Sequence, residues 1–256
     1  YTLAGAGNPE TGWGLAGETW QAMASLDHYG GPTWFRLGDR DLGTHLFRTG
    51  RLADGAGLAE VTAEVAEAWG LGFRLLPATE DRLRTMVTLA DGDEVGFQEY
   101  FVGLRHDVPV SGIRFDGADD ALPGPGVLEA ITTAEAVVIA PSNPLVSIAP
   151  ILAVPGVRDA VAARRESAVA VSPIVGGSAL KGPADRMLAE MGHESSVVGV
   201  ARLYRDLVAT LVIDRVDADL ADEVEAEGVR CVVTDTVMRT TEVAAALAKA
   251  TLGAVA

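Results

Sequence analysis

The apolar run Val137-Val138-Ile139-Ala140, followed by Pro141-Ser142-Asn143-Pro144, limits most strongly what this chain can fold into. A continuous apolar run that ends in turn residues indicates a strand buried on both faces, as in a parallel sheet. Neither proline can donate an N–H to a ladder, so the strand must end there. In open α/β sheets, ligands bind outside the carboxyl ends of the strands. The Ser-Asn pair therefore belongs either to a small-molecule site or to a turn that only caps the next helix, and the motif alone leaves both open.

The second half of the chain alternates between helical and strand patterns. Strands are predicted at 136–140, 168–171, 210–213 and 230–233, with helical segments between them. This alternation predicts an α/β fold with a mainly parallel sheet and helices on both faces. Before it, a β-hairpin is predicted over residues 84–102 around Asp91-Gly92. No Pro/Gly/Ser-rich linker divides the chain, so we expect a single domain over residues 1–256.

Small polar residues follow the ends of three predicted strands. Ser142, Asn143 and, a turn later, Ser147 follow the first; the second leads to Ser172-Pro173, a Gly-Gly-Ser segment and Lys181; the third ends at Thr234-Asp235-Thr236. Parallel strands end at one edge of their sheet, so we expect these residues to meet there in a ligand site. The glycines and Lys181 are the parts of a phosphate cradle, but their spacing is not that of a P-loop.

A helix is expected after Gly38, with Asp39 as its N-cap and with Leu42 and Leu46 forming one buried stripe. Asp41, Thr44, His45 and Arg48 then share another face of that helix. This face is either a solvated surface with Asp41 paired to His45 or part of a functional site. The combination of an acid, a hydroxyl, an imidazole and a guanidinium favours function.

The chain carries a formal net charge of −16, which argues against a nucleic-acid surface. Any bound phosphate must therefore be held by local donors, backbone N–H groups or a metal ion. The single cysteine, Cys231, allows no intramolecular disulfide, and no apolar run approaches the length of a membrane span. We therefore expect a cytoplasmic protein without a membrane partner. A zinc cluster, a G-x-S-x-G elbow and the kinase motifs are absent from the sequence.

Motifs along nearly the whole chain resemble those of the 2-phospho-L-lactate transferase family, whose actinobacterial members are called phosphoenolpyruvate transferases. The resemblance rests on seven segments, which occur in the family's order: Gly12-Trp13-Gly14, Glu18-Thr19-Trp20, Leu37-Gly38-Asp39-Arg40-Asp41-Leu42 with Thr44-His45-Leu46, Arg74-Leu75-Leu76-Pro77-Ala78, Phe97-Gln98-Glu99, Ala140-Pro141-Ser142-Asn143-Pro144 and Ser172-Pro173-Ile174.

The resemblance implies a Rossmann-like αβα sandwich, usually dimeric, that takes part in coenzyme F-420 biosynthesis. Such enzymes transfer a phosphoenolpyruvyl or 2-phospholactyl group from a guanosine diphosphate-linked donor to a hydroxyl of hydroxy-deazariboflavin (Fo). GMP leaves and Mg²⁺ is required; the resemblance does not assign the metal ligands here, nor choose between the two donors. The resemblance also implies a βα unit with a diphosphate loop ahead of Tyr1, so we expect part of the diphosphate and metal site to lie outside residues 1–256.

The resemblance and the residue patterns together give two sets of candidate residues. An alcohol must lose its proton in this reaction, and the catalytic candidates in the Gly-Asp-Arg-Asp…Thr-His segment, expected in the same cleft as the nucleotide, are Asp39, Asp41 and His45. The substrate-binding candidates are Trp13, Thr44, Arg48, Ser142, Asn143, Ser147, Ser172, Pro173, Lys181 and Asp235.

Two other functions compete with this one. A related family with the same core binds nucleotide sugars as a non-enzymatic regulator and would not need an Fo pocket. The tryptophans Trp13, Trp20 and Trp34 favour an aromatic acceptor, although core packing is their commoner use. An NAD-dependent oxidoreductase ranks third, because no G-x-G-x-x-G follows a strand.

Overall fold

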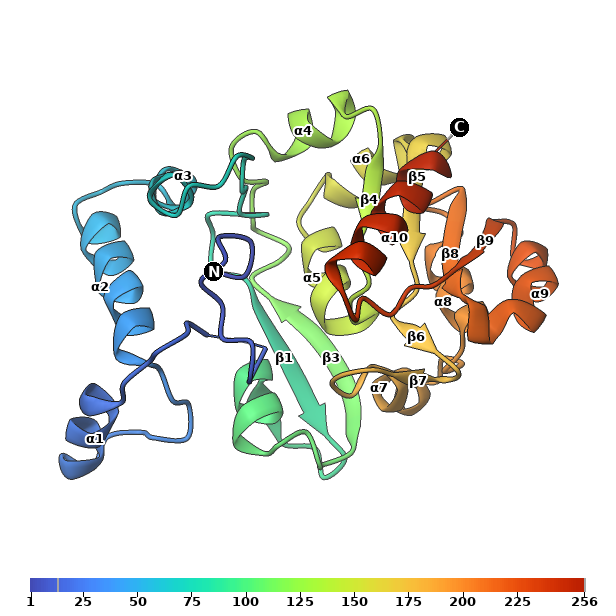
Figure 1. The fold of residues 1–256 in the computed structure, drawn as a ribbon. Coiled ribbons are helices and arrows are strands. Elements are labelled where there is room, and N and C mark those ends of the chain that lie inside the picture. Colours follow the sequence, from blue (N-terminus) through green and yellow to red (C-terminus); the bar gives the residue numbers. More distant parts are fainter. Residues whose placement is uncertain (13, 256) are drawn as a thin grey trace.

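The computed structural model describes residues 1–12 and 14–255 and places a four-stranded parallel sheet at the centre of the second half of the chain (Figure 1). Its strands are β4 (Val137–Ile139), β5 (Ala168–Val171), β8 (Thr210–Asp214) and β9 (Arg230–Thr234), in the order β4-β5-β8-β9. Each lies within one or two residues of its predicted range. The α/β fold class with a parallel sheet is confirmed.

Alternation of side chains along these strands divides the core into two layers. Ala168, Ala170, Leu211 and Ile213 belong to one buried cluster, together with residues of the helices α6, α7, α8 and α9. Val169, Val171 and Val212 belong to another, together with Leu247 of α10. Helices thus cover both faces of the sheet, as the sandwich requires. In Figure 1 α10 runs across the face of the sheet turned to the viewer.

The connecting elements of this half follow the βα alternation. In chain order they are α4 (Val127–Thr133), the π-helical turn η2 (Pro144–Ile148), α5 (Ala149–Leu152), α6 (Val157–Ala163), η3 (Arg165–Ser167), the short antiparallel pair β6 (Ile174–Val175) and β7 (Ser178–Ala179), α7 (Ala184–Glu190), α8 (Val197–Tyr204), η4 (Arg215–Leu220), α9 (Ala221–Ala226) and α10 (Thr241–Gly253).

No single helix among the described residues is both long and apolar enough to cross a membrane. The segments Pro144–Leu152 and Val157–Ala163 reach that length only as a pair bent by 94°.

The excursion predicted as a hairpin is a larger unit. Strand β1 (Arg84–Leu89) pairs with β2 (Glu94–Gly96) as expected, but also with β3 (Val110–Asp116), giving a three-stranded antiparallel sheet. The expected continuation of the second strand to Val102 is wrong: the ladder ends at Gly96, and Glu99–Gly103 form a π-helix, η1. Tyr100 of that turn is fully buried, which a flat two-stranded ribbon could not achieve.

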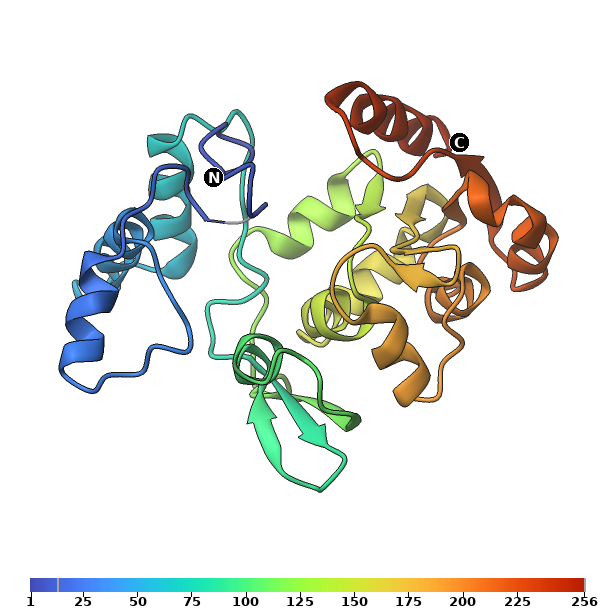
Figure 2. The same ribbon diagram turned by 60° about the horizontal axis from the view of Figure 1, so that its bottom comes forward.

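Three helices near the N-terminus form an arm on the far side of the antiparallel sheet from α8 and α9 (Figure 1). They are α1 (Gln21–His28), α2 (Asp39–Ala53) and α3 (Leu58–Ala68), and Figure 2 shows them again opposite the C-terminal half. Helix α2 packs against α1 and α3 but has no buried residue, and Leu46 is 66% exposed. The predicted buried stripe of Leu42 and Leu46 is therefore wrong.

The first turns of α1 and α2 cap each other. Asp39 accepts hydrogen bonds from the Thr19 hydroxyl and from the backbone N–H groups of Gln21 and Ala22, which open α1. Glu18 in turn accepts from the N–H groups of Arg40 and Asp41, which open α2, at 2.9 and 3.0 Å. The expectation that Asp39 caps its own helix is wrong, because Gly38 is the N-cap and Asp39 is the first helical residue.

Gly38→Ala should destabilise the protein, because a Cβ there would collide with the Glu18 carboxylate and displace it from the α2 N-terminus. Loss of a cap costs about 1 kcal/mol. Gly43→Ala, in the same helix with no atom within 4 Å of its added Cβ, should instead stabilise by up to about 1 kcal/mol. Denaturant unfolding measures both. Equal effects of the two substitutions would contradict the reciprocal caps.

Candidate functional site

A hollow of about 650 Å³ lies at the carboxyl edge of the parallel sheet. Its floor follows the strand ends: Pro141, Ser142 and Asn143 after β4, Ser172 and Pro173 after β5, and Thr236 after β9. The loop before α7 and the segment around η1 close the sides, and the full lining is Phe97, Phe101, Pro141, Ser142, Asn143, Val146, Ser147, Ser172, Pro173, Val175, Ala179, Leu180, Lys181, Gly182, Pro183, Ala184, Thr236, Val237 and Met238.

Six of the substrate-binding candidates come together in this hollow: Ser142, Asn143, Ser147, Ser172, Pro173 and Lys181. Parallel pairing explains the convergence, since it brings the ends of β4 and β5 to one edge of the sheet. Asp235 does not join them. Its exposed carboxylate accepts a hydrogen bond from Arg215 at 3.1 Å, and the next residue, Thr236, lines the hollow instead.

Asn143 and Ser172 also hold the local backbone. The Asn143 side-chain oxygen accepts from the N–H groups of Leu145 and Val146 and so caps η2, while its amide nitrogen lies 3.6 Å from the Met187 sulfur. The Ser172 hydroxyl donates to the Ile174 carbonyl and accepts from the Ile174 N–H. The capping interpretation of Asn143 is therefore confirmed, and the residue lines the hollow as well.

Asp214, at the end of β8, organises the rim of the hollow and was missed by the sequence analysis. It accepts hydrogen bonds from the Thr236 N–H, the Thr236 hydroxyl and the Val216 N–H. Burial pushes the pKa of this carboxyl upward, but the hydrogen bonds from Thr236 and Val216 outweigh it, and the pKa is lowered. The signal was present in the sequence, because a lone acid ends an apolar strand there.

The charge around the hollow differs from that of the whole chain. Although the protein has a net charge of −16, none of the described residues lining the hollow carries a carboxylate, and the one charged side chain among them is Lys181. The glycine-rich N-terminal loop reaches this lysine, since a methyl group on Gly12 would lie 3.2 Å from Lys181 Nζ. Such an environment favours an anionic ligand.

The predicted functional face of α2 holds a hydrogen-bonded group away from the hollow. The Tyr1 hydroxyl donates to Asp41 Oδ1 at 2.8 Å and lies 2.8 Å from the Thr44 hydroxyl oxygen. Arg48 lies 3.0 Å from His45 Nδ1, and His45 Nε2 lies 3.9 Å from Asp41 Oδ1. A guanidinium can only donate, so His45 Nδ1 accepts and the ring proton faces Asp41.

The structure does not bring this face into the cleft expected for the nucleotide. Thr44 and Arg48 line a separate cavity of about 200 Å³ with Tyr1 and Trp69, and none of the α2 candidates lines the hollow. Asp39 lies in neither place. The Thr19 hydroxyl bond and the two backbone N–H bonds lower its pKa, which suits a capping carboxylate rather than a base.

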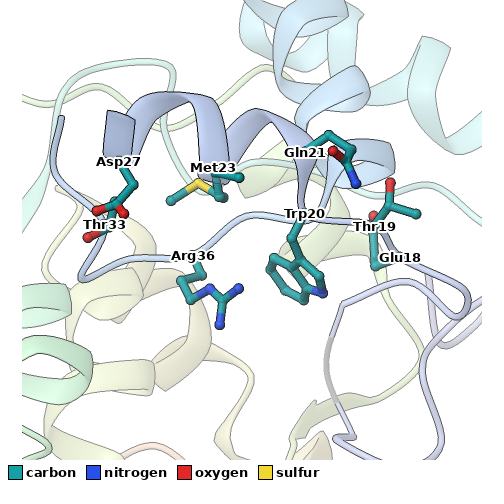
Figure 3. Close-up of a pocket in the computed structure, with 9 residues that line it drawn as sticks. Glu18, Thr19, Trp20, Gln21, Met23, Asp27, Thr33 and Arg36 are labelled. Atoms are coloured by element: carbon teal, nitrogen blue, oxygen red, sulfur yellow. The ribbon is translucent and has the colours of Figure 1, made fainter. Parts of the chain in front are cut away.

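Trp20 and Trp34, the two described tryptophans among the three, do not share one ring site either. Trp13 lies outside the described residues. Trp20 lines a cavity of about 690 Å³ beside α1, where the Arg36 guanidinium carbon lies 4.7 Å from the indole centroid (Figure 3). Trp34 packs edge-on against Phe35 instead. The cavity of Figure 3 contains no residue from either set of candidates.

The described residues do not form a magnesium site by themselves. Within residues 1–12 and 14–255, no three His, Cys, Asp or Glu side chains are gathered closely enough to hold a metal ion. Mg²⁺ prefers a near-octahedral set of oxygen ligands, often with substrate phosphates among them. The described residues therefore do not supply a complete magnesium site.

Taken together, the sheet and the hollow at its carboxyl edge define a Rossmann-like α/β protein with a small-molecule site at the strand ends. The sequence model of the family "2-phospho-L-lactate transferase CofD" matches residues 11–252. The chain belongs to this family, which places it among the transferases of coenzyme F-420 biosynthesis.

Curated relatives agree with this assignment, and a solved structure shares the fold. A phosphoenolpyruvate transferase of Streptomyces griseus is 46% identical over 98% of this chain and 81% of its own length. One from Mycolicibacterium smegmatis is 40% identical over 98% and 79%. A UPF0052 family protein from Bacillus halodurans has a TM-score of 0.56 at 19% identity, over 83% of this chain and 72% of its own, and shows the likeness of fold.

Asp214→Asn should destabilise the protein by about 1–3 kcal/mol at neutral pH, because an amide nitrogen would then face the Thr236 N–H. The folded-state pKa of Asp214 is lowered, so its stabilising contribution is present above the ordinary aspartate pKa and disappears as the pH falls through the folded value. The difference in unfolding free energy between the variant and the wild type should therefore shrink in acid.

Asp235→Asn is the control and should change stability by less than about 0.5 kcal/mol. Urea unfolding between acid and neutral pH would contradict this role if the two variants behaved alike.

Proposed function

We propose that this chain transfers a phosphoenolpyruvyl group from a guanosine diphosphate-linked donor to a hydroxyl of Fo and releases GMP. The enolpyruvyl donor is preferred to the 2-phospholactyl donor because relatives at 40–47% identity carry the name phosphoenolpyruvate transferase. Mg²⁺ stays a proposed cofactor on chemical grounds, since it neutralises phosphate charge during transfer. The homodimer and the cytoplasmic location also stay predictions.

The observation that supports the donor most directly is the composition of the hollow. It combines small polar groups at the strand ends with one lysine and, among its described lining residues, no carboxylate. A guanosine diphosphate-linked donor needs hydrogen-bonding groups for its nucleoside and positive charge for its phosphates. In this proposal Ser142, Asn143 and Ser172 contact the nucleoside part and Lys181 the phosphates.

The proposed reaction requires correct positioning of donor and acceptor more than it requires a protein nucleophile. Phosphoryl-linked transfer depends mainly on alignment and on neutralising charge on the phosphate oxygens. None of the described residues lining the hollow is an Asp, Glu or His, so the hollow itself offers no carboxylate or imidazole base. Lys181 is then the group of this chain that stabilises the departing GMP phosphate.

Product analysis tests the reaction. The full-length protein is incubated with Fo, Mg²⁺ and either the enolpyruvyl or the lactyl guanosine diphosphate donor, and the products are identified by mass spectrometry. The proposal expects GMP and a phosphoenolpyruvyl-Fo product with the first donor. GMP without an Fo adduct, or no turnover with either donor, contradicts it.

The regulator with the same core is the second candidate, because a likeness of fold at 19% identity does not separate the two functions. A regulator would bind a nucleotide ligand in the hollow and ignore Fo. Quenching of the tryptophan fluorescence by added Fo supports the transferase, whereas nucleotide-sugar binding without any response to Fo supports the regulator.

Lys181→Met should weaken binding of GDP about 10-fold or more, because a charge-assisted contact to the phosphates is lost while the apolar stem is kept. Lys249→Met, at the chain's other lysine, which is exposed on α10, is the matched control. Titration calorimetry measures both, and equal affinities for the two variants would remove Lys181 from the phosphate site.

Asp41→Asn tests whether the α2 face takes part in turnover. The catalytic prediction expects kcat to fall at least about 10-fold with a small change in stability, since Asp41 orders the Tyr1 hydroxyl and faces His45. Asp54→Asn, at the exposed C-cap of the same helix, should leave kcat unchanged. An unaltered rate for Asp41→Asn would assign this face to the surface.

A further inference from the structure

The side of the hollow opposite the strand ends is built by an unusual piece of backbone. The π-helix η1 carries Phe101, and Phe97 lies just before it. Just beyond the C-cap Leu104, Arg105 and His106 have φ values of 52° and 46°, the left-handed region that residues other than glycine seldom adopt. Single π-helical turns and strained backbone both concentrate at functional sites. The fold therefore maintains costly geometry on one wall of the hollow.

That wall is aromatic. The Phe97 and Phe101 rings stack with centroids 5.5 Å apart and planes inclined by 28°, and the His106 ring lies 5.0 Å from Phe101. Both phenylalanines are half-buried and line the hollow. Leu180, Gly182 and Met238 line the same space, and a methyl group on Gly182 would stand 3.7 Å from the Phe101 ring. This end of the hollow is apolar.

The wall is also held firmly from behind. Fully buried Tyr100 of η1 accepts a hydrogen bond from Arg186 of α7 at 2.5 Å, and Arg186 also donates to the His106 carbonyl. Arg186 pairs with Glu190 at 3.2 Å, and Glu190 accepts from the N–H of Val110 on β3. Helix α7 therefore fixes η1 and the strand beyond it together. A wall fixed in this way loses little freedom when a ring stacks on it.

We propose that Phe97 and Phe101 form the stacking wall for the fused aromatic ring of the acceptor. This inference rests on the proposed function. The donor's nucleoside and phosphates match the polar end of the hollow, whereas a tricyclic ring matches the apolar end. Lys181 is adjacent in sequence to Gly182, which faces Phe101, so a ring on this wall has its hydroxyl-bearing side chain within reach of the phosphate position.

Phe97→Leu and Phe101→Leu keep apolar volume but remove the stacking surface. Each should raise the KM and the Kd for Fo roughly 3- to 10-fold while leaving kcat and the Kd for GDP within about twofold of the wild type. Phe101→Tyr keeps the ring and should bind Fo as the wild type does. Fluorescence titration with Fo and calorimetry with GDP give the two affinities, and thermal unfolding checks the fold of each variant.

Phe115→Leu is the matched control, because Phe115 lies on β3 of the same antiparallel sheet and is not among the residues lining the hollow. Unchanged Fo binding in both leucine variants overturns the proposal. So does a loss of GDP affinity with Fo binding intact, which would assign the wall to the guanine base. If the wild-type chain does not bind Fo, both the proposed function and this subsite are overturned. If the wild type binds Fo and the two leucine variants bind it equally well, only the subsite is overturned.

Discussion

Parallel pairing of β4, β5, β8 and β9 is the constraint on which the rest of this structure depends. It brings together the carboxyl ends of strands that are far apart in the sequence. Short polar segments that would not form a site separately therefore line one hollow. The same pairing buries both faces of the two central strands, so every residue of β5 and β8 is buried. The edge strand β4 was also expected to be buried on both faces, but this is wrong, because Val138 is 44% exposed at the edge of the sheet. Site and core are consequences of one topology.

The hollow is completed by a second unit that the sheet does not contain. The antiparallel sheet shares a buried cluster with Val146 of η2 and Met187 of α7, two elements that follow or flank the strand ends. Through that cluster η1 is brought against the polar edge, and an aromatic wall faces a polar floor. A two-sided site of this kind suits a reaction between two chemically different substrates, a charged nucleotide donor and a flat acceptor.

The N-terminal arm has a different organisation. Its helices are joined less by apolar burial than by the exchange of caps between Glu18 and Asp39, and α2 buries no side chain at all. The motif Leu37-Gly38-Asp39-Arg40-Asp41-Leu42, which resembles an active-site signature, thus has an evident structural use: glycine makes room for one carboxylate, and aspartate supplies the other. Asp41 and His45 stay the catalytic candidates of that motif, although neither lines the hollow.

The sequence by itself determined the α/β class, the positions of the four parallel strands to within two residues and the six candidates that meet in the hollow, because buried parallel strands and their ends have local signatures. Tertiary structure decided the rest. Whether residues 99–102 form a strand or a π-helix depends on burial of Tyr100 against α7, and whether Asp39 caps its own helix or its neighbour depends on how α1 and α2 cross. Asp235 and Thr236 are adjacent and equally polar, yet only the threonine is turned into the hollow by Asp214. A local sequence pattern limits the structures and contacts that are open to a residue. Long-range contacts, which a short stretch of sequence does not contain, decide which of these the residue adopts.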